Sequence, residues 1–119
     1  MSQLKEVSPN YYILDPELDV AKELSSAIKW YSPKFSPKDV PRFYDISSLT
    51  ENPALFNKVI DTMVARYEAL GDAKPTHILG FDARGFLLGT PISLRLNIPF
   101  VLMRKSAKSP GVLVESEPY

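Results

Sequence analysis

The sequence predicts an α/β fold built on a parallel sheet, and three consecutive segments carry that prediction. Residues 77–81 and 98–103 are short apolar runs with the length and composition of buried strands. Between them, residues 85–96 supply enough apolar side chains at helical spacing to cover one face of a sheet. A strand, a helix and a strand of these lengths form a right-handed crossover unit, so the two strands are expected to be parallel neighbours.

Two further helices are predicted nearer the amino terminus. An Asp-Pro pair opens the first, over residues 15–31, because proline at the first helical position gives up an amide that lacks a partner there. An Asn-Pro pair opens the second, over residues 52–71, which ends at a glycine able to adopt the left-handed conformation. The apolar stripe of the second helix is interpreted as core packing.

Composition narrows the class of protein. The 119 residues are 45% hydrophobic and 24% charged, as in one globular domain, and 14 basic residues balance 14 acidic ones. No net field therefore draws the chain to nucleic acid or to an anionic membrane. There is no cysteine, which excludes disulfides and thiolate metal sites. No apolar run has the length of a signal peptide or a membrane span, so we expect a cytoplasmic protein.

Polar residues follow the first predicted strand as Asp82-Ala83-Arg84-Gly85. In an open parallel sheet, ligands bind beyond the carboxyl ends of the strands, where helix amino termini point at the site. Gly85 lets backbone approach a ligand, and the Arg84 guanidinium suits a bidentate phosphate contact. This segment is a candidate phosphate site; the alternative is a surface turn in which Arg84 pairs with Asp82.

The second predicted strand ends in Arg104-Lys105, with Lys108 shortly after. If the strands are adjacent, Arg104 and Arg84 emerge at the same edge, and two like charges at close range favour a bound anion. That arrangement predicts a polyphosphate ligand. The alternative is a solvated basic loop.

A third candidate is Arg42-Phe43-Tyr44, which follows the proline-rich loop 32–41. Its aromatic side chains could form a flat wall for a heterocyclic ring, or could belong to the core. His77, the only histidine, is interpreted as structural, because no second ligand is spaced to join it. No metal site is predicted in the chain itself.

From about residue 31 to the end, the chain resembles the adenine phosphoribosyltransferases, and their protozoan branch in particular. The resemblance depends on four segments in register: 43–47 (Phe-Tyr-Asp-Ile-Ser), 52–53 (Asn-Pro), 80–86 (Gly-Phe-Asp-Ala-Arg-Gly-Phe) and 101–105 (Val-Leu-Met-Arg-Lys). It implies a parallel-sheet phosphoribosyltransferase fold that is incomplete in this chain. Residues 1–119 would form a single domain, with an amino-terminal helix and base-binding hood over 1–48 and the first half of the α/β core over 49–119.

The resemblance also implies an activity. The family transfers ribose 5-phosphate from 5-phosphoribosyl-1-pyrophosphate to N9 of adenine, giving AMP and pyrophosphate in purine salvage, with Mg²⁺ bound to the phosphoribosyl substrate. By resemblance, Asp82, Ala83, Arg84 and Gly85 form the pyrophosphate loop, with a cis peptide bond between Ala83 and Arg84. Arg104 matches a residue that reaches pyrophosphate across the interface of a homodimer, and Lys105 and Lys108 match its basic neighbours.

In the same family, the segment matching Arg42, Phe43 and Tyr44 binds adenine, its backbone at the edge of the base and an aromatic ring on the face. Glu117 and Tyr119 are candidates for the family's catalytic carboxylate and aromatic residue. The family's threonine- and glycine-rich loop for the ribose phosphate does not occur in these 119 residues. We therefore expect a truncated piece of the enzyme that does not turn over substrate alone.

Three other functions stay open at this point. The chain could belong to a non-catalytic purine or phosphoribosyl sensor, or to a phosphoribosyltransferase for another purine base. It could also be a small interaction module, although the clustered cations have no natural explanation in that case.

Overall fold

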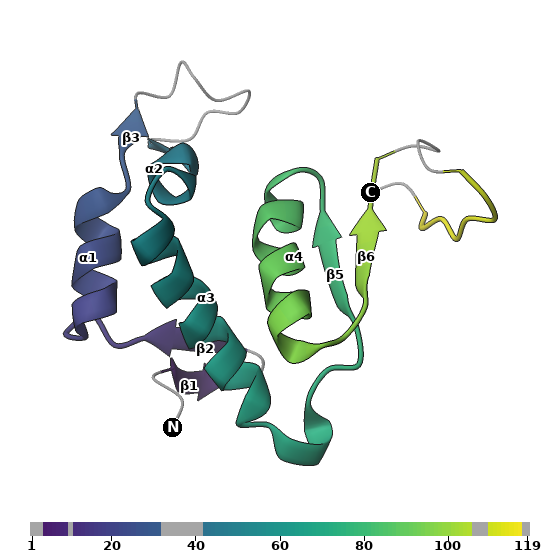
Figure 1. Ribbon diagram of the computed structural model, residues 1–119, viewed down its shortest axis with the longest axis horizontal. Helices are drawn as coiled ribbons and strands as arrows, with labels where there is room; N and C mark the ends of the chain where they lie inside the picture. Colours follow the sequence, from purple (N-terminus) through teal and green to yellow (C-terminus); the bar gives the residue numbers. More distant parts are fainter. Residues whose placement is uncertain (1–3, 10, 32–41, 106–109, 118–119) are drawn as a thin grey trace. The chain divides into compact units, whose positions relative to one another are not determined.

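The computed structural model describes residues 4–9, 11–31, 42–105 and 110–117, and the chain divides into two compact units, Met1–Lys74 and Pro75–Tyr119 (Figure 1). Each unit is described by itself. The sequence-based expectation of one domain, with its hood and core meeting near residue 48, stays a prediction.

The second unit is the predicted strand, helix and strand. Strands β5 (Ile78–Phe81) and β6 (Phe100–Met103) are hydrogen-bonded and parallel, with Ile78 opposite Phe100 and Phe81 opposite Met103. Helix α4 (Arg84–Leu96) connects them and packs along the two strands (Figure 1). The α/β prediction is confirmed, and so is the parallel pairing.

Glycines bring α4 unusually close to β5. A Cβ added at Gly80 would lie 2.6 Å from the Gly85 carbonyl oxygen, and one added at Gly85 would lie 3.0 Å from the Gly80 carbonyl carbon. A Cβ at Gly89 would collide with the Phe100 ring, which also packs edge-on against Phe86 with 6.0 Å between centroids. Gly85 was predicted to let backbone approach a ligand; it also allows the helix to contact the strand directly.

The carboxyl end of α4 has a left-handed cap. Asn97 has φ 55° and follows the last helical residue, and the Ile98 amide donates to the Ser93 carbonyl at 3.0 Å. Asparagine tolerates this conformation because its short side chain interacts with local backbone. The predicted end of the helix near residue 97 is confirmed.

The described residues of the first unit form three α-helices and two short antiparallel ladders (Figure 1). A hairpin pairs β1 (Leu4–Ser8) with β2 (Tyr11–Leu14), and a second ladder pairs β3 (Trp30–Tyr31) with β4 (Phe43–Tyr44). The helices are α1 (Asp19–Ala27), α2 (Ser47–Thr50) and α3 (Pro53–Glu68), followed by the 3₁₀ turn η2 (Gly71–Ala73).

The prediction for the first helix was too long at both ends. Asp15 caps a turn instead of the helix, since its carboxylate accepts from the Glu17 amide at 2.9 Å and α1 starts only at Asp19. At the other end, Ile28 is extended with ψ 117°, and the chain continues into β3. Pairing of β3 with β4 replaces the last helical turn, because tertiary hydrogen bonds outweigh the small difference in helix propensity.

The prediction for the second helix is confirmed. The Asn52 side-chain oxygen accepts from the Leu55 amide at 3.2 Å, Pro53 occupies the first helical position, and Gly71 has φ +57° beyond the last turn. Leu55, Ile60 and Val64 are buried along α3. The hairpin β1–β2 was not predicted; the Arg66 guanidinium lies 3.8 Å from the centre of the Tyr12 ring and holds β2 against α3.

We predict that Gly80→Ala and Gly89→Ala both destabilise the protein, by about 1 to 3 kcal/mol, because the added methyl group overpacks the contact between helix and strand. Gly80→Ala should cost more, since its methyl meets backbone of Gly85, whereas Gly89→Ala meets only the Phe100 ring. Urea denaturation measures both. Thr90→Ala, at an exposed position of the same helix, is the control and should change stability by no more than about 0.5 kcal/mol.

We predict that Asn52→Ala lowers the free energy of unfolding by about 1 kcal/mol, because it removes the side-chain acceptor for the first turn of α3. Asn52→Ser keeps a capping oxygen and should retain most of the stability. Equal losses in the two variants, measured by thermal denaturation, would show that the cap contributes nothing.

Candidate functional site

The carboxyl ends of β5 and β6 form one edge that gathers the predicted anion-binding residues. Phe81 and Met103 are the last paired residues, and the Asp82 amide donates to the Met103 carbonyl at 3.2 Å. The turn after β5 therefore lies beside the segment after β6, which begins with Arg104. The conditional prediction that the strands are adjacent is confirmed, and Arg84 and Arg104 follow neighbouring strands at this edge.

Helix α4 begins at the same edge. Its N-cap is Ala83, whose side chain cannot cap the first-turn amides, and its 13 residues align their peptide dipoles with the positive end here. The Phe86 amide donates to the Ala83 carbonyl at 3.1 Å, which closes the first turn. Backbone amides, a helix dipole and two arginines at one place form an arrangement suited to a phosphate group.

The predicted position of the cis peptide bond was wrong by one residue. The bond between Asp82 and Ala83 is cis, and the bond between Ala83 and Arg84 is not. Ala83 has helical backbone angles, and its carbonyl accepts the first hydrogen bond of α4. The Ala83–Arg84 bond thus belongs to the first helical turn, whose regular geometry uses trans peptides.

The remaining residues of the predicted anion site differ in exposure. Asp82 and Gly85 are half-buried, whereas Arg84, Arg104 and Lys105 are exposed. Lys108 and Tyr119 lie outside the described residues. Glu117 is exposed, and its backbone carbonyl accepts from the Ser116 hydroxyl at 3.3 Å.

The predicted base-binding segment forms part of the β3–β4 ladder. Trp30 is opposite Tyr44 and Tyr31 is opposite Phe43. Paired residues in an antiparallel ladder share a face and neighbours along a strand alternate, so Phe43 and Tyr44 lie on opposite faces. The Arg42 guanidinium lies 4.8 Å from the centre of the Trp30 ring, which places it on the Tyr44 face.

The sequence analysis treated Arg42, Phe43 and Tyr44 as one group and did not include Trp30. The structure divides that group: Trp30 and Tyr44 are 54% and 55% exposed on one face, and Phe43 is half-buried on the other. Trp30 was missed because residues 28–31 were predicted to end a helix. The only tryptophan of the chain, next to a proline-rich loop, was the available signal.

A cluster of hydrogen bonds holds the residues that follow β4. The Asp45 carboxylate accepts from the Ser47 hydroxyl at 2.5 Å and from the Ser47 amide at 3.0 Å. These two bonds, together with the positive charge of Lys29, lower the pKa of Asp45 below its ordinary value. Asp45 therefore stays ionised and keeps the start of α2 in place at neutral pH.

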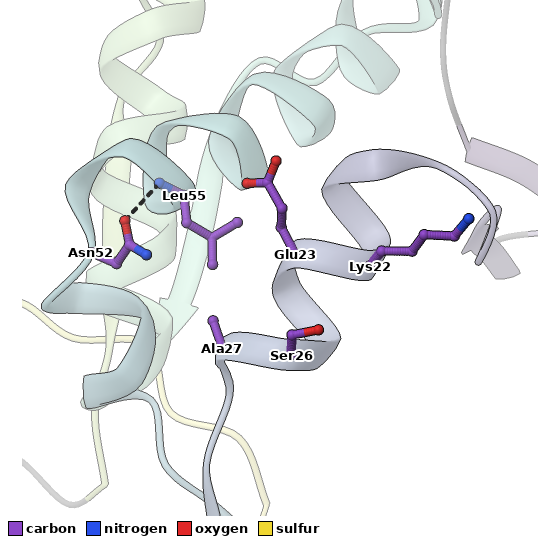
Figure 2. A pocket seen from close by; sticks show the side chains of 6 residues that line it. All are labelled: Lys22, Glu23, Ser26, Ala27, Asn52 and Leu55. Atoms are coloured by element: carbon purple, nitrogen blue, oxygen red, sulfur yellow. Dashed lines mark hydrogen bonds between the residues drawn. The ribbon is translucent and has the colours of Figure 1, made fainter.

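A separate hollow of about 480 Å³ lies in the first unit, between α1 and the start of α3 (Figure 2). Three of the polar side chains that line it are engaged in contacts within the protein. Lys22 pairs with Glu17 at 3.1 Å, and Glu23 pairs with Lys58 at 2.7 Å. The Asn52 oxygen caps α3 by accepting from the Leu55 amide, as Figure 2 shows. None of the residues predicted to bind a ligand lines this hollow.

The described residues hold neither a candidate metal site nor a candidate membrane span. Within residues 4–9, 11–31, 42–105 and 110–117, no three histidine, cysteine, aspartate or glutamate side chains are grouped so that they could hold a metal ion. Over the same ranges, no helix has both the length and the apolar character needed to cross a membrane.

Comparison with known protein families identifies the family to which the domain with this sheet edge belongs. Residues 45–119 match the family described as the phosphoribosyl transferase domain. The chain belongs to this family. The matched range contains the whole β5–α4–β6 unit, with its predicted anion-binding residues. The predicted base-binding residues Arg42, Phe43 and Tyr44 lie outside it.

Individual relatives of the domain are adenine phosphoribosyltransferases. The chain is 49% identical over 74 residues to the adenine phosphoribosyltransferase of Pasteurella multocida, covering 62% of this chain and 39% of the relative. The enzyme of Haemophilus ducreyi is 39% identical over 98 residues, covering 82% of this chain and 50% of the relative. The resemblance to adenine phosphoribosyltransferases is confirmed.

Solved structures agree with these relatives. The adenine phosphoribosyltransferase of Leishmania tarentolae is 51% identical with a TM-score of 0.84, covering 98% of this chain and 53% of its own. The Trypanosoma brucei enzyme, solved with AMP, pyrophosphate and ribose-5-phosphate, is 51% identical with a TM-score of 0.85, covering 100% and 51%. This phosphoribosyl transferase domain therefore spans about half the length of the enzymes it matches.

We predict that Asp45→Asn removes one pH-dependent contribution to stability. The folded pKa of Asp45 is lowered, so its contribution is complete above the ordinary carboxyl pKa of about 4 and is lost as the pH falls through the folded pKa. Urea titrations between pH 7 and pH 3, followed by Trp30 fluorescence, should show a smaller loss of stability in Asp45→Asn than in the unmodified protein. Ser47→Ala removes the hydroxyl hydrogen bond to Asp45 and keeps the amide hydrogen bond, so its loss of stability should be intermediate. Identical pH profiles for all three proteins would contradict the role of Asp45.

Proposed function

We propose that the protein is an adenine phosphoribosyltransferase, which transfers ribose 5-phosphate from 5-phosphoribosyl-1-pyrophosphate to N9 of adenine in purine salvage. The sheet edge carries the proposal, because the Asp82–Gly85 turn, the start of α4 and Arg104 meet there in an arrangement suited to pyrophosphate. The names of the relatives and the products bound in the Trypanosoma brucei structure support it.

The chemistry requires charge stabilisation where the bond breaks. As the bond between ribose C1′ and the pyrophosphate oxygen breaks, the electron pair leaves with pyrophosphate. N9 of adenine forms the new bond to C1′ and loses its proton, for which a carboxylate such as the proposed Glu117 would be the acceptor. Negative charge thus accumulates on the leaving group while the ribose becomes cationic. Arg84, Arg104 and the first-turn amides of α4 would stabilise pyrophosphate, with Lys105 and Lys108 as further cations. Mg²⁺ would arrive with the phosphoribosyl substrate, as part of that substrate.

The β3–β4 ladder would bind adenine. Phe43 offers a half-buried ring for stacking, and the backbone of Arg42 and Tyr44 offers hydrogen-bonding groups for the edge of the base. Because Arg42 stacks on Trp30, we propose that its backbone, and not its guanidinium, contacts adenine. One face of β4 would then stack on the base through Phe43, and the other face would hold the strand in place through the contact of Arg42 with Trp30.

Further parts of the proposal follow the family resemblance. Glu117 and Tyr119 are proposed as the catalytic carboxylate and aromatic residue. We propose a homodimer, as the family resemblance implies. The reach of Arg104 across its interface stays a prediction of that resemblance, because the backbone of this chain brings Arg104 to the same sheet edge as Arg84. A cytoplasmic location stays a prediction.

The direct test measures AMP formation. The 119-residue chain, and any longer product of the same gene, are each incubated with adenine, 5-phosphoribosyl-1-pyrophosphate and Mg²⁺, and AMP and pyrophosphate are quantified. The longer product should form both in equal amounts, whereas the 119 residues should bind pyrophosphate without turnover. Binding of adenine without turnover by the longer product would support a purine sensor, and preference for guanine or hypoxanthine would support another phosphoribosyltransferase.

We predict that Arg84→Gln and Arg104→Gln each weaken pyrophosphate binding by roughly ten- to a hundredfold, since a hydrogen bond to a charged group contributes about 1.5 to 3 kcal/mol. Isothermal titration with Mg-pyrophosphate measures the effect. Arg95→Gln, at the opposite end of α4, is the matched control and should bind as the unmodified protein does. Equal behaviour of the three variants would remove the sheet edge as the pyrophosphate site.

A further inference from the structure

The backbone of Lys29 is held from both sides by the segment that follows β4. Its amide donates to the Ser48 hydroxyl oxygen at 3.1 Å, and its carbonyl accepts from the Asp45 amide at 2.8 Å. Lys29 immediately precedes β3, and Asp45 immediately follows β4. These two bonds therefore close the base of the β3–β4 ladder.

The ladder needs such an anchor because it is very short. It contains only two residue pairs, Trp30 with Tyr44 and Tyr31 with Phe43, and an isolated two-stranded ladder is at best marginally stable in water. Trp30 and Tyr44 are both more than half exposed, so burial of side chains on their face contributes little. Contacts outside the ladder must fix the position of β4.

Ser48 lies on an element that can provide this fixed point. It belongs to α2, whose next residue, Leu49, is 3% exposed, and α2 packs against both α1 and α3. The Asp45 carboxylate also accepts two hydrogen bonds from Ser47, the first residue of the same helix. A hydroxyl on a packed helical turn holds a backbone amide more precisely than a solvated side chain would, because burial of its neighbours restricts its motion.

We propose that Ser48 is a positioning residue for adenine binding: its hydroxyl holds Lys29 outside helix α1 and thereby sets the place of the base-binding strand β4. The proposal rests on the proposed function of that strand. Ser48 acts through Lys29 and the ladder, and Phe43 and its neighbouring backbone contact the base. Loss of the hydroxyl should thus weaken adenine binding without affecting the pyrophosphate site, which belongs to the other unit.

The first experiment compares steady-state kinetics of Ser48→Ala with those of the unmodified, catalytically active gene product. The KM for adenine should rise about three- to tenfold, while the KM for 5-phosphoribosyl-1-pyrophosphate and kcat change less than twofold. Ser48→Thr retains the acceptor and should restore the adenine KM. Thr50→Val, which removes the hydroxyl that donates to the Ser47 carbonyl in the same helix, is the matched control and should leave all three parameters unchanged.

The second experiment needs no substrate, because Trp30 is the only tryptophan and adjoins Lys29. Acrylamide quenching of its fluorescence should increase in Ser48→Ala and return to the unmodified value in Ser48→Thr. If Ser48→Ala does not fold, Ser48→Cys, which has nearly the same shape and a much weaker acceptor, takes its place.

Three outcomes would overturn the proposal. Unchanged adenine KM and unchanged quenching in Ser48→Ala would show that the hydroxyl positions nothing. An equal rise in both substrate KM values would indicate a general structural role. In the third outcome, quenching increases in Ser48→Ala as expected, but the unmodified protein forms no AMP and binds no adenine. That result would reject the proposed function and, with it, the role of Ser48 in base binding.

Discussion

The close contact between α4 and β5 is the constraint on which the second unit depends. Gly80 and Gly85 let two backbones approach to a distance that no Cβ would permit, and Gly89 makes room for the Phe100 ring beside them. This contact fixes where α4 begins relative to the end of β5. It therefore places the first-turn amides and Arg84 at the edge of the sheet to which the parallel pairing of β5 with β6 also brings Arg104.

Side chains contribute less to this arrangement than backbone does. Among the described residues, the buried apolar side chains are Leu49, Leu55, Ile60, Val64 and Ile92. By contrast, Leu79 and Phe81 on β5 are 57% and 69% exposed. With so few buried side chains, the hydrophobic contribution to stability is modest, and specific backbone contacts gain importance in fixing the site.

The proposed base-binding segment is held in place in a different way. Its two-pair ladder is held at one end by the hydrogen bonds of Lys29 with Ser48 on α2 and with Asp45, and by a guanidinium stacked on Trp30. Polar anchoring of a short ladder leaves one aromatic face available for a ligand. The two proposed binding regions thus depend on different contacts. Close packing of backbone fixes the anion-binding region, and hydrogen bonds anchor the base-binding region.

The sequence by itself determined the β5–α4–β6 unit, the helix opened by Asn52 and Pro53, and the candidate anion residues, because apolar periodicity and capping residues act over short distances along the chain. Tertiary structure decided what depends on distant partners. It ended α1 at Ala27, since Lys29 bonds to Ser48 and Asp45, and it added Trp30 to the proposed base-binding ladder. It also placed the cis bond before Ala83, because Ala83 caps the first turn of α4. Finally, it put Phe43 and Tyr44 on opposite faces of β4, because the faces of a strand are defined only once a partner strand pairs with it.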